Sequence, residues 1–226
     1  NIVKWVDWDD AGFAYADAQM DPRTGETLHA QVFMTSAFGF GGKAQARRIL
    51  RKLLSNKKDS PAPAKIFGVK GLSGKPLCEK HVNSQLVEVI TNLLETGKDD
   101  ETILKIAQDY IREVVAHEVG HTLGLRHNFA GSHATNFSQD KKQELFQEYI
   151  ENKKTTFGVV TTSSTMEYQR FEEAVMSGDM LQNSKLPAFE YDQKAIQHLY
   201  YGREYSRSET PAFCTDSDVG RYIDCD

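Results

Sequence analysis

Residues 117–127 read His-Glu-Val-Gly-His-Thr-Leu-Gly-Leu-Arg-His, and this stretch is the most informative part of the sequence. In a helix, His117 and His121 lie one turn apart on the same face, so both imidazoles can reach one metal ion at about 2.0–2.1 Å. Gly124 can end the helix in the left-handed conformation, and the turn brings His127 back as a third ligand. Three protein ligands leave a fourth position for water, which is the pattern of catalytic rather than structural zinc sites.

Glu118 has a different role in the same stretch. It follows His117 directly but points about 100° around the helix, so it need not bind the ion. Its carboxylate can instead hold a water molecule at the metal and take its proton as a general base. A structural zinc site has no use for a carboxylate here, so the pattern predicts hydrolysis. The alternative is a helix with stacked core histidines, which would bury three imidazoles without a metal.

The residues before this stretch predict one long helix. Asp99 and Asp100 can cap its start, because acids favour the positive end of a helix. Apolar side chains then recur every three or four residues, at Ile103, Ile106, Ala107, Tyr110 and Val114. The same stripe continues into the two helical histidines, so we expect their imidazoles to face inward.

Strands and helices in the rest of the chain predict an α/β fold. Strands are expected near residues 1–8, 13–18, 27–37 and 64–70, with a hairpin turn at 21–26 that contains Pro22 and Gly25. Further helices are expected at 43–56, 82–96, 140–152 and 191–201, and around Met176 and Met180. We expect one catalytic domain over 1–226. Its upper lobe, about 1–124, would hold a twisted sheet and the long helix, and its lower lobe, about 125–226, would be smaller, helical and irregular.

Composition and charge exclude several classes of protein. The chain has 226 residues, 39% of them hydrophobic, and a net charge of -5, which excludes collagen, coiled coils and disordered tails and argues against nucleic-acid binding. No apolar stretch is long enough to span a membrane. Residues 43–58 carry seven basic side chains and no acid. We interpret them as an amphipathic helix with a solvated basic face; a docking surface for an acidic partner or a membrane is the alternative.

The eleven residues match the pattern HExxHxxGxxH, so the chain resembles the metzincin zinc peptidases. The resemblance implies a methionine-containing turn after the third histidine, for which Ser163-Ser164-Thr165-Met166-Glu167-Tyr168 is the candidate. Met166 would form an apolar floor beneath the histidines without binding the metal. In some metzincin groups a tyrosine in the place of Tyr168 reaches the zinc or stabilises the oxyanion; a packed tyrosine is the alternative.

Three segments resemble one bacterial branch of large exported zinc peptidases. They are His-Glu-Val-Gly-His-Thr-Leu-Gly-Leu-Arg-His-Asn-Phe (117–129), Asp-Pro-Arg-Thr-Gly-Glu (21–26) and Tyr-Asp-Gln-Lys-Ala-Ile (191–196). In that branch the stretch at 213–216 is followed by more chain, and this chain starts at Asn1 with no signal peptide. We therefore expect the catalytic core of a longer exported bacterial protein. Asn128 differs from the matrix metallopeptidases, so their substrate rules do not transfer.

The cysteines and the acidic tail leave alternatives open. In an exported protein Cys214 and Cys225, eleven residues apart, can close a small loop as a disulfide; three reduced, buried thiols, Cys78 among them, are the alternative. The tail carries Asp216, Asp218, Gly220, Asp224 and Asp226. Alternating carboxylates of this kind can bind calcium, but their spacing matches no complete loop, so a solvated acidic tail is the main interpretation.

The residues together predict a zinc-dependent endopeptidase that binds a protein or peptide substrate, extended along an edge strand. One alternative is a zinc-containing but inactive module that binds a protein, against which the intact Glu118 argues. Another is a zinc amidase that acts on a small or cell-wall substrate, because the metal chemistry would be identical.

Overall fold

A computed structural model describes residues 2–10, 12–55, 80–81, 83–183, 188–219, 221 and 225 of the chain. The chain forms two compact units, residues 1–107 and 108–226, whose boundary lies inside the long helix α3 (Asp100–Thr122). The strand predicted at 64–70 and Cys78 lie outside the described residues. The single domain with lobes that meet at Gly124 stays a prediction.

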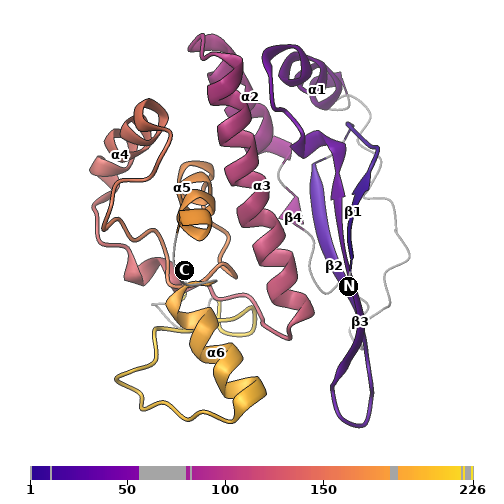
Figure 1. The fold of residues 1–226 in the computed structure, drawn as a ribbon, viewed down its shortest axis with the longest axis vertical. Coiled ribbons are helices and arrows are strands. Elements are labelled where there is room, and N and C mark those ends of the chain that lie inside the picture. Colours follow the sequence, from indigo (N-terminus) through magenta and orange to yellow (C-terminus); the bar gives the residue numbers. More distant parts are fainter. Residues whose placement is uncertain are drawn as a thin grey trace. The chain divides into compact units, whose positions relative to one another are not determined.

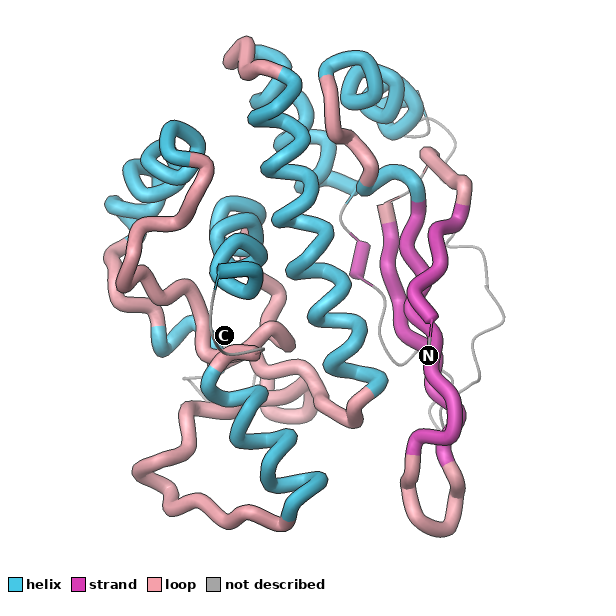
Figure 2. Tube along the Cα trace, viewed as in Figure 1, coloured by secondary structure: helices cyan, strands magenta, loops and turns pink. Residues whose placement is uncertain are grey.

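The first unit contains a four-stranded sheet in the order β1-β3-β2-β4 (Figure 2). The strands are β1 (Ile2–Val6), β2 (Phe13–Met20), β3 (Thr27–Thr35) and the short β4 (Lys80–His81). β1 runs parallel to β3, whereas β2 is antiparallel to both of its neighbours. With the helices described below, this sheet confirms the predicted α/β class.

The β2–β3 hairpin confirms the turn that was predicted at 21–26. Gly25 has a φ of +75°, in the left-handed region that glycine adopts at little cost, and its N–H donates to the carbonyl of Asp21. Along β3, Ala30, Val32 and Met34 are buried, while Gln31 and Phe33 between them are half-buried. This alternation is typical of a strand with one covered face.

Helix α1 (Lys43–Ser55) is the predicted basic amphipathic helix. Ile49 and Leu53 on one side are buried, and Arg47 lies exposed on the other. Arg48 forms an ion pair of 2.6 Å with the buried carboxylate of Asp9. A short helical turn, η1 (Ser36–Phe38), precedes α1, and α2 (Asn83–Glu95) follows the undescribed segment and packs against α1.

Helix α3 begins and ends at the residues that the sequence predicts. The Asp99 carboxylate accepts a hydrogen bond from the N–H of Thr102 at 2.7 Å, which caps the first turn. At the other end, the N–H of Gly124 donates to the carbonyl of His121, and the N–H of Leu125 donates to the carbonyl of Gly120, both at 3.0 Å. Gly124 has a φ of +88°, so the helix ends in a Schellman motif. The predicted apolar stripe is buried throughout: Ile103, Ile106, Ala107, Tyr110 and Val114.

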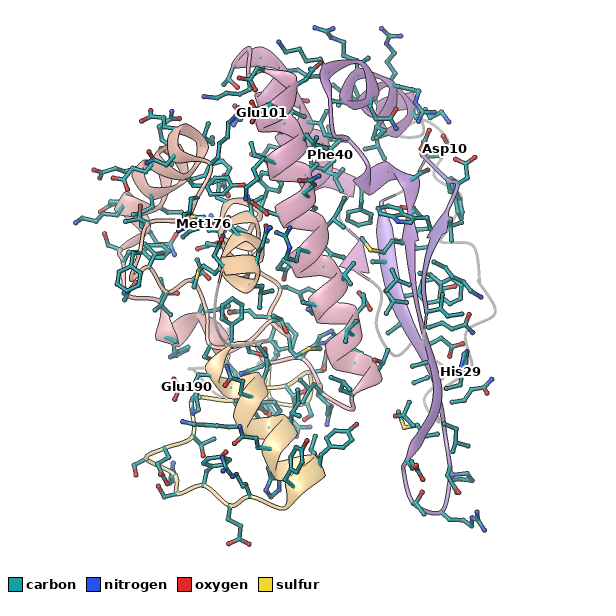
Figure 3. The ribbon with its side chains drawn as sticks, viewed as in Figure 1. Asp10, His29, Phe40, Glu101, Met176 and Glu190 are labelled. Atoms are coloured by element: carbon teal, nitrogen blue, oxygen red, sulfur yellow. A yellow bond between two sulfur atoms is a disulfide. The ribbon has the colours of Figure 1, made fainter. Side chains whose placement is uncertain are left out.

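In the second unit, further helices follow the C-terminal part of α3. They are η3 (Gly131–Ala134), α4 (Gln139–Asn152), α5 (Phe171–Asn183) and α6 (Glu190–Tyr201). α4, α5 and α6 lie on one side of α3 (Figure 1). These three confirm the helices expected in this half, whereas η3 was not predicted. A Cβ at Gly178 of α5 would lie 1.9 Å from the backbone oxygen of Asp109, so α5 contacts α3 through a glycine. Tyr149 of α4 donates to the Asp109 carboxylate at 2.6 Å, and Met176 of α5 is fully buried (Figure 3).

None of the helices among the described residues combines the length and the apolar character that crossing a membrane would require.

Candidate metal centre

Three histidines converge in the second unit. His117 and His121 occupy successive turns of α3, with ring centroids 4.9 Å apart. The chain reverses at Gly124 and brings His127 to centroid distances of 5.4 Å from His117 and 4.8 Å from His121. One ligand atom from each histidine lies within 4.8 Å of the other two. The structure thus brings together the three histidines that the sequence proposed as ligands.

The Nδ1 atom of each ring contacts an oxygen that can only accept. His117 Nδ1 donates to the carbonyl of Thr165 at 2.7 Å, and His121 Nδ1 to the carbonyl of Leu125 at 3.0 Å. His127 Nδ1 donates to the Asp216 carboxylate at 3.0 Å. The proton of each neutral ring is therefore on Nδ1, which leaves the Nε2 lone pair as the available ligand.

This donor set fits a metal cation. The Nε2 atom of His121 is buried and makes no hydrogen bond within the described ranges, an arrangement that a cation would satisfy. Burial lowers the pKa of His121 to about 4, so the ring is neutral near pH 7. Imidazoles bind zinc in their neutral form, so this set of donors suits the ion.

Glu118 lies on the same turn of α3 as His117 and is fully buried. A carboxylate in such surroundings is shielded from bulk water. Its attraction to a positive charge is therefore stronger than it would be in water. Its sequence position between the two helical histidines places it within one turn of both.

The turn that contains Met166 lies directly against the histidine helix. Met166 is fully buried, and a Cβ added at Gly120 would lie 2.2 Å from its sulfur. Only a glycine at this point of α3 leaves room for the thioether. The carbonyl of Met166 also accepts the N–H of Asn128 at 3.0 Å, next to the third histidine. Met166 therefore packs against α3 at Gly120, the residue before His121. Its role as an apolar floor beneath the histidines stays a prediction.

Asp192, near the start of α6, holds this turn in place. Its two carboxylate oxygens accept hydrogen bonds from the hydroxyl of Ser164 at 2.5 Å and from the N–H of Thr165 at 2.8 Å. Burial raises the pKa of Asp192, although these hydrogen bonds act in the opposite direction. The sequence showed Asp192 only as a residue near a helix start, so this role was missed; an acid in the first turn of a helix is the single signal that it left.

Tyr168 reaches the histidines directly. Its hydroxyl donates a hydrogen bond of 2.9 Å to Nε2 of His127, and its ring lies 5.4 Å from that of His117 at 26°. The side chain is 39% exposed, so the phenol contacts both the histidines and solvent. This position is compatible with either role considered for it, zinc contact or stabilisation of an oxyanion.

The C-terminal segment lies along the chain that follows the third histidine. Cys214 and Cys225 form a disulfide with Cα atoms 5.6 Å apart, buried beside Ala130. The fully buried Asn128 accepts the N–H of Cys214 at 3.0 Å and donates to the carbonyl of Ala212 at 3.0 Å. These contacts bring the residues after Cys214 to the edge of the histidine cluster.

The tail carboxylates considered for calcium have other contacts where they are described. Asp216 accepts a hydrogen bond from Nδ1 of His127. Desolvation acts to raise the pKa of Asp216, but this hydrogen bond and the attraction to His127 lower the pKa overall. Asp218 accepts the N–H of Thr215 at 3.1 Å. Gly220, Asp224 and Asp226 lie outside the described residues, so the calcium site stays a prediction. Elsewhere in the described ranges, no second group of three ligand side chains gathers.

A family model described as Met-zincin matches residues 99–213. The matched region includes the three histidines, Met166 and Tyr168, and it ends before Asp216. No curated protein and no solved structure matches the chain. The family match and the histidine cluster together imply a zinc ion.

Proposed function

Because the chain belongs to the Met-zincin family, which implies zinc metallopeptidase chemistry, we propose that it is an endopeptidase that hydrolyses internal peptide bonds of a protein or peptide. The observation that carries the proposal is the convergence of three histidines, each with its Nδ1 proton donated to an acceptor. A buried glutamate on the same helix supplies the general base that a structural zinc site would lack.

The roles of the residues follow from their chemistry. His117, His121 and His127 would hold the ion through Nε2, and at His127 the ion would take the place of the Tyr168 hydroxyl that donates to Nε2. When bound, zinc supplies Lewis-acid chemistry, since it lowers the pKa of a water molecule to about 7 and polarises a carbonyl. Glu118 takes the proton from the attacking water and passes it to the amine nitrogen as the carbon–nitrogen bond breaks. The hydroxyl of Tyr168 donates a hydrogen bond to the developing oxyanion.

Replacement of Glu118 by Gln tests the mechanism. We expect hydrolysis of casein or a labelled peptide to fall by at least about 10²-fold, the lower end of what a general base contributes. Zinc content, measured by mass spectrometry, should remain one ion per chain, because Glu118 is not a ligand. The exposed Glu204→Gln is the matched control and should keep full activity. Full activity of Glu118→Gln would overturn the mechanism.

Two other functions remain as alternatives. An inactive module that binds a protein would retain zinc but release no fragments from a peptide library, and an amidase would cleave only small or cell-wall amides. A digest of a peptide library, with cleavage sites identified by mass spectrometry, separates the first alternative from an endopeptidase. A screen of small amides and cell-wall fragments tests the second.

We propose an exported bacterial location for the protein. The disulfide between Cys214 and Cys225 supports it, because disulfides persist in oxidising compartments and are rare in the cytosol. Titration of free thiols in protein purified without reductant tests this point. One free thiol per chain, from Cys78, is expected if the pair is oxidised in its native compartment; three would contradict the proposal.

A further inference from the structure

Asp216 is the one side chain among the three acceptors of the histidine Nδ1 protons. Thr165 and Leu125 accept through backbone carbonyls, whereas Asp216 accepts through Oδ1 at 3.0 Å from His127. Asp216 lies 89 residues beyond His127 in the chain and outside the region that the Met-zincin family matches. A carboxylate in this position can be removed by substitution without a change to the backbone.

The surroundings of the pair favour a directed contact over a chance surface pair. The His127 side chain is 6% exposed, so its ring is fixed by packing, while the Asp216 side chain is 55% exposed. The segment before Asp216 is held by a buried amide: Asn128 accepts the N–H of Cys214, and the N–H of Phe129 donates to the Cys214 carbonyl at 2.7 Å.

Two further contacts fix the same segment. The disulfide joins Cys214, two residues before Asp216, to Cys225. The N–H of Thr215 donates to the carboxylate of Asp218, which closes a turn around Asp216. The backbone on both sides of Asp216 is therefore constrained, and the carboxylate meets His127 with little conformational freedom left to lose.

We infer that Asp216 is a positioning residue for the third zinc ligand. Its carboxylate accepts a hydrogen bond from the Nδ1–H of His127, and this bond orients the ring. The bond also keeps the tautomer in which Nε2 carries no proton, and it makes Nε2 a stronger donor to the metal. The inference rests on the proposed zinc site and not on peptidase activity, so metal binding alone can test it.

The experiment compares the zinc dissociation constants of Asp216→Ala, Asp216→Asn and the whole wild-type chain by competition with a chromophoric chelator. Asp216→Ala should bind zinc about 10–100-fold more weakly, the usual effect of losing such a partner. Asp216→Asn should lose less zinc affinity, because the amide oxygen still accepts a hydrogen bond from the Nδ1–H of His127. Asp140→Asn, an exposed carboxylate at the start of α4, is the matched control and should bind like the wild type.

A second measurement separates positioning from folding. The melting temperatures of the zinc-free chains should agree between the wild type and both Asp216 variants, while the shift produced by added zinc should shrink in Asp216→Ala. Equal zinc affinity of Asp216→Ala and the control would overturn the inference, as would an equal loss of stability with and without zinc. A wild-type chain that binds no zinc would overturn the proposed function itself.

Discussion

At the scale of single residues, each histidine of the centre uses its two ring nitrogens differently. The Nδ1 atoms donate to two carbonyls and one carboxylate, and one ligand atom of each ring lies within 4.8 Å of the other two. The hydroxyl of Tyr168, at 2.9 Å from Nε2 of His127, is a polar group beside the ligand atoms that is also exposed to solvent. It can therefore meet a substrate and the metal centre together.

Replacement of Tyr168 by Phe should lower kcat by about 10²–10³-fold, the usual effect of removing one donor to an oxyanion. KM and the zinc content should change little, because the phenyl ring preserves the packing against the histidines. Steady-state kinetics on a labelled peptide measure the effect. Tyr201→Phe, which is 79% exposed on α6, serves as the control. An unchanged kcat would favour the interpretation of Tyr168 as a packed side chain.

At the scale of elements, helix α3 and the turn that contains Met166 contact each other at a glycine, Gly120. Gly120 precedes His121 on α3, and the sulfur of Met166 occupies the space where a side chain would begin. Asp192 of α6 accepts hydrogen bonds from Ser164 and Thr165 of the same turn. The turn is thus fixed between α3 and α6, and the Thr165 carbonyl is presented to His117 as a result.

Gly120→Ala should destabilise the chain by about 1–3 kcal/mol, because the new methyl group overlaps the Met166 sulfur. In a Met166→Ala background the same substitution should be neutral or stabilising by up to about 1 kcal/mol, since alanine is the better helix former. Urea unfolding of the four proteins of this double-mutant cycle measures the coupling. The same effect of Gly120→Ala in both backgrounds would contradict the contact.

At the scale of the whole molecule, every residue assigned to the centre belongs to the unit of residues 108–226. The first unit has a core of its own, with Val32 and Met34 of β3 and Ile49 of α1 buried within it. A ligand that binds only the folded state stabilises the part of the structure that holds it, by RT ln(1 + [L]/Kd). Zinc should therefore stabilise the second unit more than the first.

Removal of zinc by a chelator should abolish hydrolysis and lower the melting temperature, and one equivalent of zinc should restore both. Hydrogen exchange should then become faster in peptides that cover 127–130, 163–168 and 212–216, which contain the ligands or their partners, than in peptides of the β2–β3 hairpin at 13–35. An equal increase in both units would show that zinc stabilises the chain globally and would contradict this division.

The sequence by itself determined the parts of the centre that depend on local geometry. The spacing of His117 and His121 follows from the helical repeat, and Gly124 ends the helix because glycine tolerates the left-handed conformation. Both the stripe of buried residues and the cap at Asp99 follow from the same short-range rules. Period and capping act within a few residues, so they can be inferred without a structure.

Only the tertiary structure decided which groups support the ligands. The acceptors of His117 and His127 lie 48 and 89 residues away, and one of them is a backbone carbonyl that any residue type would supply. Asp192, 27 residues beyond Thr165, anchors the methionine turn. No local pattern links residues so distant in the chain. Their contacts arise because α6 and the C-terminal segment fold back onto the turns after α3, and that folding depends on packing throughout the unit.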